Sequence, residues 1–245
     1  MFVYTKGAEL AAFIPFQGMP DIYSKYESAT LFPLFANRVL PKTRPEFKHL
    51  ARWSGLDVNS HSIELEMLSI TAGQRETDNI RLIARPEPSA DGFYYLTFFV
   101  HGMRYLDEKS LEVLKTLKRG SELSLLFETD NAYDQYAIAV ENQDTPPCKL
   151  GYVPRYYAQD LRKALHDIDP EKRTVRVKKI NHDAPLQLRL MCEIEVCLPK
   201  GHAPLVSDEY IPLYKPGVKA QVQPANKPPQ KHAATRKKPT EPVPH

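Results

Sequence analysis

The sequence of 245 residues has no long hydrophobic run. A membrane-spanning helix needs about 20 mostly apolar residues in succession, and no segment approaches that length. The apolar stretch nearest the amino terminus, LAAFIPF, is short and is not followed by a small-residue cleavage pattern, so it lacks the form of a signal peptide. We therefore expect a cytoplasmic protein with no part in a membrane.

Cysteine is scarce, since the chain contains only Cys148, Cys192 and Cys197. Three cysteines are too few for a disulfide framework. Cys192 and Cys197 lie in an alternating segment that is typical of a β-strand, where residues five apart point to opposite faces and lie about 16 Å apart. They are not expected to share a zinc ion or to bond to each other, so we predict buried thiols and no metal site.

Motifs of common catalytic sites are missing as well. The chain has no G-x-x-x-x-G-K-[ST] phosphate loop, no H-E-x-x-H zinc motif and no G-x-S-x-G nucleophile turn. The histidines are scattered without carboxylates at spacings that suggest metal ligands, as at His49, His61, His101, His166 and His182. We expect a protein that is not an enzyme and uses no cofactor, so any motor or nuclease activity would come from another polypeptide.

The net charge of +3 is concentrated near the carboxyl end. Between Lys215 and His245 there are seven Lys or Arg residues and one acid, so the rest of the chain carries a net charge of −3. Nucleic-acid binding by the folded part would therefore depend on local residues, because its bulk charge does not favour it. The same segment is rich in proline and poor in large apolar residues, which is typical of a disordered tail.

Changes in composition divide the chain into four parts. Residues 1–86 are expected to form a mixed α/β domain, residues 87–92 a linker, residues 93–198 a second domain, and residues 199–245 a mostly disordered tail. Within the first part, RPEFKHLARWSGL predicts a helix with Pro45 in its first turn and Gly55 at its end. SIELEMLSITAG predicts a second helix that ends at Gly73, and NIRLIARP predicts a strand.

The second domain alternates short strands with two helices. FYYLTFFVHG, ELSLLFE, YAIAVEN, KLGYV, RTVRVKKI and LQLRLMCEIEVCL predict strands. LDEKSLEVLKTLKRG predicts a helix with Arg119 in its last turn and Gly120 at its end, and Pro154 opens another helix that carries Leu161. Because no βαβ rhythm is present, we expect an α+β protein whose second domain is a small barrel or a strongly curved sheet.

Three strand ends in this domain carry exposed polar and aromatic residues. VHGMRYLD leaves Arg104 and Tyr105 at the exit of one strand, DNAYD is a turn with a tyrosine between two acids, and LGYVPRYYAQDL places Tyr152 and Arg155 at a strand-to-helix junction. Their order over residues 93–196 resembles the HIRAN domain, a module of some DNA-remodelling helicases that also occurs as a free-standing domain in bacteria. The resemblance implies an OB-like barrel that captures the 3′ end of single-stranded DNA.

The resemblance also implies roles for the residues of the turn. Tyr105 and Tyr133 would stack on the terminal bases, and Asp134 would receive the terminal 3′-hydroxyl with Asn131 close by. The chemistry is consistent with these roles, since stacking on an aromatic ring is worth roughly 1–3 kcal/mol per base and is independent of the base. A carboxylate is a good acceptor for a hydroxyl and a poor neighbour for a phosphate, so Asp134 would select a chain end over a continuing strand.

The resemblance to the HIRAN domain also implies that Arg104 and Arg155 contact phosphates. Tyr152 departs from the family pattern, because the best-known member has a histidine at this place. A tyrosine hydroxyl still donates a hydrogen bond to a phosphate, but it does not become cationic near neutral pH.

Ordinary structural interpretations exist for the same residues. Asp130 and Asn131 are common in turns, Tyr133 would also suit the core at the end of a barrel, and single arginines are often solvated. Taken together, the pattern predicts a non-catalytic protein that binds 3′-hydroxyl ends of single-stranded DNA in repair or processing, beside a helicase or nuclease on another chain. The alternative is an adaptor that docks a protein partner through the barrel groove or the amino-terminal domain.

A second, shorter resemblance concerns residues 31–73. LFPLFANRVLPKTRPEF and SGLDVNSHSIELEMLSITAG are similar to the small leading subdomain of HipA-type toxin kinases. The similarity ends after Gly73 and no kinase body follows, so it implies a docking element without phosphoryl transfer. The basic segment KHAATRKKP in the tail is either a nonspecific contact to DNA or a solubilising end.

Overall fold

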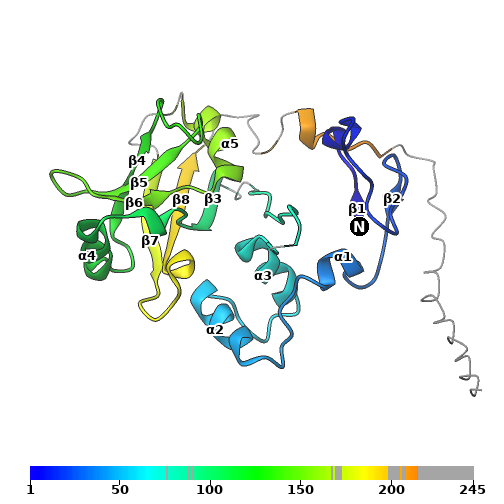
Figure 1. Cartoon of the computed structure of the whole chain (residues 1–245), viewed down its shortest axis with the longest axis horizontal. Helices are drawn as coiled ribbons and strands as arrows, with labels where there is room; N and C mark the ends of the chain where they lie inside the picture. Colours follow the sequence, from blue (N-terminus) through cyan, green and yellow to red (C-terminus); the bar gives the residue numbers. More distant parts are fainter. Residues whose placement is uncertain are drawn as a thin grey trace, which may run out of the picture. The chain divides into compact units, whose positions relative to one another are not determined.

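Figure 1 shows the chain as a computed structural model that describes residues 1–75, 77–87, 89, 91–166, 168, 173–197, 205 and 208–214. Contacts divide the chain into two compact units, one of Met1–Glu27 with the chain from Asp208 onward and one of Ser28–Ser207. The domain boundaries expected near residues 86 and 93 fall inside the second unit and stay a prediction. Most of the expected tail lies outside the described residues.

The smaller unit joins the amino terminus to a segment near residue 210. Its elements are β1 (Phe2–Val3), η1 (Lys6–Glu9), β2 (Lys25–Tyr26) and η5 (Asp208–Tyr210), with β1 antiparallel to β2. Tyr4 is buried and its hydroxyl donates to the Met19 carbonyl at 2.8 Å. Thr5 forms a bridge with Pro212, and the Leu213 amide donates to the Tyr4 carbonyl at 2.8 Å. Residues that the sequence assigned to the tail are therefore paired with the start of the chain.

The larger unit begins with three helices, α1 (Pro33–Ala36), α2 (Pro45–Ser54) and α3 (Ile63–Thr71). The two helices expected here are confirmed as α2 and α3. Gly55 ends α2 with a φ of 69°, a left-handed conformation that glycine adopts without steric cost. The two helices pack around a small core of buried side chains from Phe47, Ala51, Ile63 and Met67.

The prediction of a strand for NIRLIARP is wrong. Residues 79–86 belong to neither sheet of the described chain, and the Leu82 amide donates to the Ala72 carbonyl at 2.8 Å. The apolar residues of this segment reflect packing, since Ile83 lies against the core of the six-stranded sheet. A strand needs a neighbouring strand for its hydrogen bonds, and this segment pairs with none among the described residues.

Six strands form one antiparallel sheet in the order β3-β8-β7-β4-β5-β6. They are β3 (Phe93–Phe99), β4 (Glu122–Phe127), β5 (Ile138–Asn142), β6 (Lys149–Tyr152), β7 (Arg173–Ile180) and β8 (Leu190–Cys197). The sheet curls, and its two edges meet where His101 and Tyr152 exchange two backbone hydrogen bonds of 2.9 Å (Figure 1). The expected α+β fold with an OB-like barrel is confirmed.

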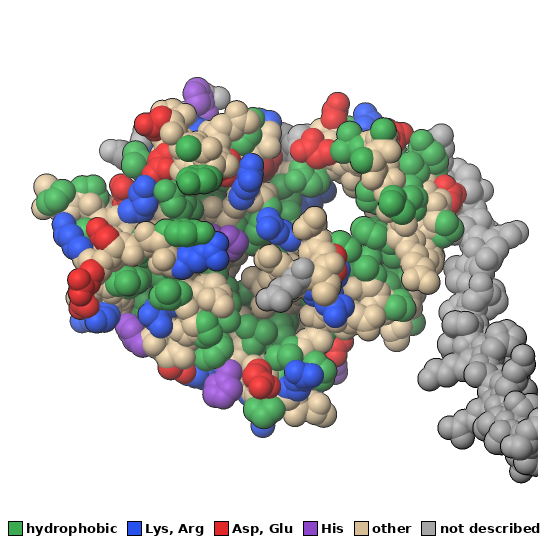
Figure 2. All heavy atoms as spheres, in the orientation of Figure 1, with side chains coloured by type: hydrophobic (Ala, Val, Ile, Leu, Met, Phe, Trp, Pro, Cys, Tyr) green, Lys and Arg blue, Asp and Glu red, His purple; other side chains and the backbone are tan. Residues whose placement is uncertain are grey.

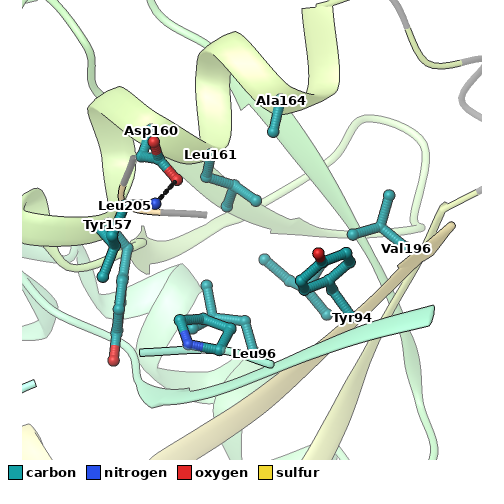
Figure 3. Close-up of a pocket in the computed structure, with 10 residues that line it drawn as sticks. Tyr94, Leu96, Tyr157, Asp160, Leu161, Ala164, Val196 and Leu205 are labelled. Atoms are coloured by element: carbon teal, nitrogen blue, oxygen red, sulfur yellow. Dashed lines mark hydrogen bonds between the residues drawn. The ribbon is translucent and has the colours of Figure 1, made fainter. Parts of the chain in front are cut away.

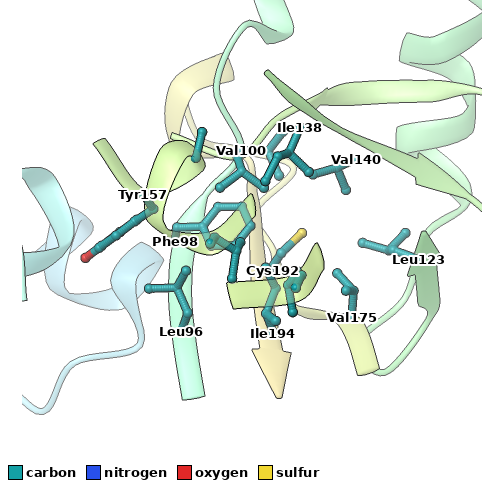
Figure 4. Packing of buried hydrophobic residues seen from close by; sticks show 14 of the residues in the cluster. Leu96, Phe98, Val100, Leu123, Ile138, Val140, Tyr157, Val175, Cys192 and Ile194 are labelled. Atoms are coloured by element: carbon teal, nitrogen blue, oxygen red, sulfur yellow. The ribbon is translucent and has the colours of Figure 1, made fainter. Parts of the chain in front are cut away.

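The curled sheet encloses a continuous hydrophobic core, part of which is shown in Figure 4. Cys192 and Ile194 of β8 point into this core. The prediction of buried thiols is confirmed for Cys148 and Cys192 and is wrong for Cys197, which is exposed at the end of the strand. Burial raises the pKa of the Cys192 thiol, which keeps it protonated and inert. The described residues contain no group of three side chains that could hold a metal ion.

The helix α4 (Glu108–Thr116) begins at Asp107, whose carboxylate accepts a hydrogen bond from the Ser110 amide at 2.8 Å. The expectation that this helix continues to Arg119 is wrong. Leu117 adopts an extended backbone with a ψ of 145° and packs against the core, so the helix ends before it.

None of the helices in the described ranges is long and apolar enough to cross a membrane.

The helix α5 (Arg155–His166) packs its apolar side on β3 and β8. Figure 3 shows this contact, where a small apolar cavity of about 30 Å³ is lined by Tyr94, Leu96, Tyr157, Leu161, Ala164 and Val196. The Leu205 amide donates to the Asp160 carboxylate at 3.0 Å beside it. The Tyr157 hydroxyl donates to the Ala84 carbonyl at 3.1 Å and so holds the segment that leads into β3.

Candidate nucleic-acid interface

The exit of β3 carries two predicted site residues on the short turn η2 (Met103–Tyr105). Gly102 precedes this turn with a φ of 76°, and a β-carbon at Gly102 would lie 3.0 Å from the ring of Tyr152. Tyr105 projects outward and 75% of its surface is exposed. The Arg104 guanidinium lies 4.6 Å from the centroid of the Tyr105 ring, a cation–π contact that pairs the two side chains at the surface.

The DNAYD turn has a defined shape because two side chains bond to its backbone. Asn131 Oδ1 accepts hydrogen bonds from the amides of Tyr133 at 2.9 Å and Asp134 at 3.1 Å. Asp134 Oδ1 in turn accepts a hydrogen bond from the Tyr136 amide at 2.9 Å. The turn presents Tyr133 to solvent with 91% of its surface exposed, so the interpretation of Tyr133 as a core residue is wrong.

The junction between β6 and α5 supplies the third segment. Gly151 has a φ of 136°, and a β-carbon there would lie 2.4 Å from the His101 carbonyl oxygen, so only glycine permits this close approach to the exit of β3. Arg155 starts α5, and its Nε lies 3.8 Å from Asp134 Oδ2. The Arg155 side chain is largely exposed, so this loose ion pair leaves it able to contact another anion.

Glu128, which no sequence motif indicated, connects these segments. Its carboxylate accepts hydrogen bonds from Asn131 Nδ2 at 2.7 Å and from the Tyr152 hydroxyl at 3.2 Å, and it pairs with the Lys149 ammonium. Burial alone would raise the pKa of Glu128, but the hydrogen bonds from Lys149, Asn131 and Tyr152 outweigh burial and hold the pKa below its ordinary value. The carboxylate is therefore charged at neutral pH and fixes the turn to β6.

Arg162 of α5 is a second residue that no sequence motif indicated. Its Nη1 donates to the carbonyl oxygens of Glu128 and Gln135, both at 2.9 Å. These two carbonyls flank the turn on either side, so one guanidinium holds its two ends together. The same guanidinium lies 5.6 Å from the centroid of the Phe127 ring.

Residues 93–198, which contain the curled sheet and all three site segments, match the family model of the HIRAN domain. This part of the chain is a HIRAN domain. Membership of this family indicates a nucleic-acid-binding module, and HIRAN domains are in general binding domains rather than catalytic ones. The residues that precede the HIRAN domain, including α2 and α3, lie outside the match.

Two solved structures are similar to part of the chain. A protein from Lactobacillus plantarum is 25% identical, and the similarity covers 43% of this chain and 99% of that one with a TM-score of 0.32. The HIRAN domain of human HLTF is 18% identical, with 44% of this chain and 78% of that one covered and a TM-score of 0.26. No curated protein matches the chain.

Within the HIRAN domain, direct contacts link most of the predicted site residues. The turn, β6 and α5 are joined through Asn131, Tyr133, Asp134, Tyr152 and Arg155, with Glu128 between them. Arg104 and Tyr105 lie on η2, which packs against β6. No ring contact between described residues joins Tyr105 to Tyr133, so their meeting at one opening stays a prediction.

Proposed function

We propose that the HIRAN domain binds the 3′-hydroxyl end of single-stranded DNA during DNA repair or processing. The observation that carries this proposal is the exposure of Tyr105 and Tyr133, which exceeds that of every other aromatic side chain in the described ranges. Rings this exposed add little to the folded core, and both belong to turns with a fixed backbone. An exposed ring on a rigid turn suits a platform for a nucleic-acid base.

Stacking on these rings gives affinity without sequence preference. Each base stacked on an aromatic side chain contributes roughly 1–3 kcal/mol, and every base has a face that stacks. Arg104 strengthens this platform, because its guanidinium already lies over the Tyr105 ring and presents its donors to solvent. The domain would therefore hold the last nucleotides of a strand whatever their sequence.

Asp134 provides the selection of a chain end. Its Oδ1 is engaged by the Tyr136 amide, whereas Oδ2 has the loose contact with Arg155. In the proposal, Oδ2 accepts a hydrogen bond from the terminal 3′-hydroxyl, and Asn131 holds Asp134 in place through its backbone amide. A 3′-phosphate would bring a second negative charge to the same oxygen and would be repelled.

Arg155 and Arg104 are proposed to contact phosphates inward of the terminal nucleotide. Arg155 is mostly exposed and its pairing with Asp134 is weak, so a phosphate can replace or share that partner. Tyr152 is differently placed, since its hydroxyl donates to Glu128 and receives a hydrogen bond from Lys149. To contact a phosphate, the Tyr152 hydroxyl would have to give up its hydrogen bond to Glu128. The hydroxyl links β6 to the turn with the hydrogen bonds that it already forms.

The wider role follows from the absence of catalytic motifs in the sequence. We propose that the protein is not itself an enzyme, acts in the cytoplasm, and marks DNA ends for a helicase or nuclease on another polypeptide. The HipA-like similarity of residues 31–73 stays a prediction of a docking element. An adaptor that binds only proteins is the competing function, and DNA-binding measurements distinguish the two.

The deciding experiment compares three ends on one sequence by fluorescence anisotropy. Single strands labelled at the 5′ end would carry a 3′-hydroxyl, a 3′-phosphate, or a 3′ end closed into a hairpin. We expect the tightest binding to the free 3′-hydroxyl, because only this end satisfies Asp134. Equal binding to all three, abolished when residues 215–245 are deleted, would mean nonspecific attraction to the basic tail, and no binding at all would favour the adaptor.

A further inference from the structure

A basic hollow lies at the start of α2, outside the HIRAN domain. It has a volume of about 540 Å³, and its charged or titratable lining residues are Lys42, Arg44, Lys48, His49 and Arg52. All five side chains are exposed, and none of the described lining residues is acidic. The face of the molecule in Figure 2 shows Lys and Arg side chains scattered among acidic and hydrophobic ones. Around the hollow, four of the described lining residues are cationic.

Neighbouring acids neutralise only part of this charge. Lys42 Nζ lies 3.5 Å from Glu64, and Arg52 pairs with the Asp183 carboxylate. Arg44 and Lys48 form no ion pair within the described ranges, and neither side chain is held by another described contact. The hollow therefore keeps two cationic side chains without a protein partner among the described residues, and both are long and flexible enough to follow a ligand that carries repeated negative charges.

The hollow is connected to the HIRAN domain by a buried side chain. Asn181 follows β7, and its Nδ2 donates to the carbonyls of Trp53 in α2 and Leu188 in η4 (Leu186–Leu188), both at 2.9 Å. The turn η4 in turn packs against η2, which carries Arg104 and Tyr105. In Figure 1 the yellow turn after β7 lies beside α2, in agreement with the hydrogen bond from Asn181 to Trp53.

We propose that the hollow at the start of α2 binds the sugar–phosphate backbone of the same single strand whose 3′ end the HIRAN domain holds. The inference rests on the proposed function for its first contact and adds a second contact point further along the strand. A phosphate backbone fits because it is a regular series of anions and needs only mobile cations for binding. An acidic peptide fits less well, since Pro45 is the one apolar residue among the described lining residues and offers little to anchor apolar side chains.

The experiment measures anisotropy with 3′-hydroxyl oligonucleotides of about 4 and about 16 nucleotides, the limits of site size for one OB-type fold. The test variant is the double substitution Arg44→Ala and Lys48→Ala. The matched control is Lys118→Ala with Arg119→Ala, which removes two exposed charges between α4 and β4 that do not line the hollow. A second variant, Lys48→Glu, tests the same site by charge reversal, and circular dichroism checks that each variant folds.

We expect the test variant to bind the short oligonucleotide like the unchanged protein and the long one more weakly. The slope of log affinity against log salt for the long strand should flatten by about 0.7 for each phosphate that the variant no longer neutralises, and the control should not change it. Equal effects of both double variants, or equal effects on both lengths, would overturn the inference. So would competition by polyglutamate as effective as competition by the long oligonucleotide.

The outcome for the hollow is separable from the outcome for the 3′ end. If the test variant has no effect while the preference for a 3′-hydroxyl persists, the backbone contact is wrong and the end-binding proposal stands. If all ends bind equally but the test variant still weakens the long strand, the hollow binds nucleic acid and the end-binding proposal fails.

Discussion

Glu128 and Asn131 are joined by a hydrogen bond of 2.7 Å from the amide Nδ2 to the carboxylate. This bond leaves Asn131 Oδ1 pointing at the backbone of the turn, where it accepts from the amides of Tyr133 and Asp134. One carboxylate behind the turn therefore sets the position of the exposed ring and of the acid beside it. Binding of a DNA end requires this fixed turn, because stacking on Tyr133 and recognition of the hydroxyl by Asp134 both need a backbone that is ordered before DNA binds.

The first prediction concerns the stability that Glu128 provides. Glu128→Gln keeps the shape of the side chain but removes the charge that Lys149 and the Tyr152 hydroxyl contact. We expect the free energy of unfolding to fall by about 1–2 kcal/mol, because the hydrogen bonds to a partly buried charged group are weakened. Urea unfolding measures this change. Glu112→Gln is the control, since its pair with Lys115 is exposed and should contribute less than about 0.5 kcal/mol. Equal reductions in both variants would contradict a special role for Glu128.

The second prediction is the pH dependence of the same contribution. The pKa of Glu128 is lower in the folded protein than in the unfolded chain, so the unfolded state takes up a proton first as the pH falls. The stabilisation should be complete above the ordinary glutamate pKa of about 4.3 and should disappear as the pH falls through the lowered folded value. The difference in unfolding free energy between the unchanged protein and Glu128→Gln should therefore shrink in acid. A constant difference from neutral pH to about pH 3 would contradict it.

Local sequence patterns were sufficient to predict most of the elements. Pro45 and Gly55 marked the ends of α2, and period-two alternation correctly placed Cys192 and Cys197 on opposite faces of β8. The error at residues 79–86 has a physical cause, because apolar content alone does not reveal whether a neighbouring strand edge exists. The same limit applies to residues 208–214, whose pairing with Tyr4 and Thr5 depends on a contact about 200 residues away in the sequence.

The candidate site was partly visible in the sequence. Gly102 and Gly151 belonged to the motifs that suggested the family, and their positive φ angles explain why glycine is needed there. Glu128 was missed because an acid at the end of a strand usually faces water, and its partners Lys149 and Tyr152 follow more than twenty residues later. Its position directly after β4 and three residues before Asn131 was the available signal.

The third prediction tests the closure of the barrel beside the site. In Gly151→Ala, the new β-carbon would lie 2.4 Å from the His101 carbonyl oxygen and 2.5 Å from Val100, so the backbone must move. We expect a decrease in stability well above the roughly 1–2 kcal/mol that a left-handed alanine costs alone. Gly120→Ala is the control for conformation, because Gly120 has a φ of 85° and nothing within 4 Å of the added carbon.

Hydrogen exchange separates barrel opening from global unfolding in these variants. The amides of His101 and Tyr152, which bond across the two sheet edges, should lose protection in Gly151→Ala before the amides of β7 and β8 do. If Gly151→Ala and Gly120→Ala were equally stable and the amides of His101 and Tyr152 stayed protected, closure of the sheet would not depend on the close approach of Gly151 to the His101 carbonyl.

The fourth prediction isolates the contribution of the exposed ring at the turn. Tyr133→Ala should weaken binding to 3′-hydroxyl single-stranded DNA by about 1–3 kcal/mol, the value of one stacked base. The free energy of unfolding should change by less than about 0.5 kcal/mol, because the side chain is 91% exposed. Tyr95→Ala removes another exposed tyrosine, on β3 and outside the site, and should leave binding unchanged. Unchanged DNA affinity in Tyr133→Ala would exclude stacking on this ring.

The fifth prediction addresses the choice of a hydroxyl over a phosphate. Asp134→Asn keeps an oxygen that accepts from the Tyr136 amide but removes the negative charge. We expect the preference for a 3′-hydroxyl over a 3′-phosphate to fall by about 1–4 kcal/mol, the Coulomb energy of two charges 4 Å apart between bulk water and a shielded surface. Most of this change should be tighter binding of the 3′-phosphate strand, measured by anisotropy. Asp130→Asn removes an exposed charge from the same turn, so an equal effect there would mean that general repulsion, and no specific contact at Asp134, selects the DNA end.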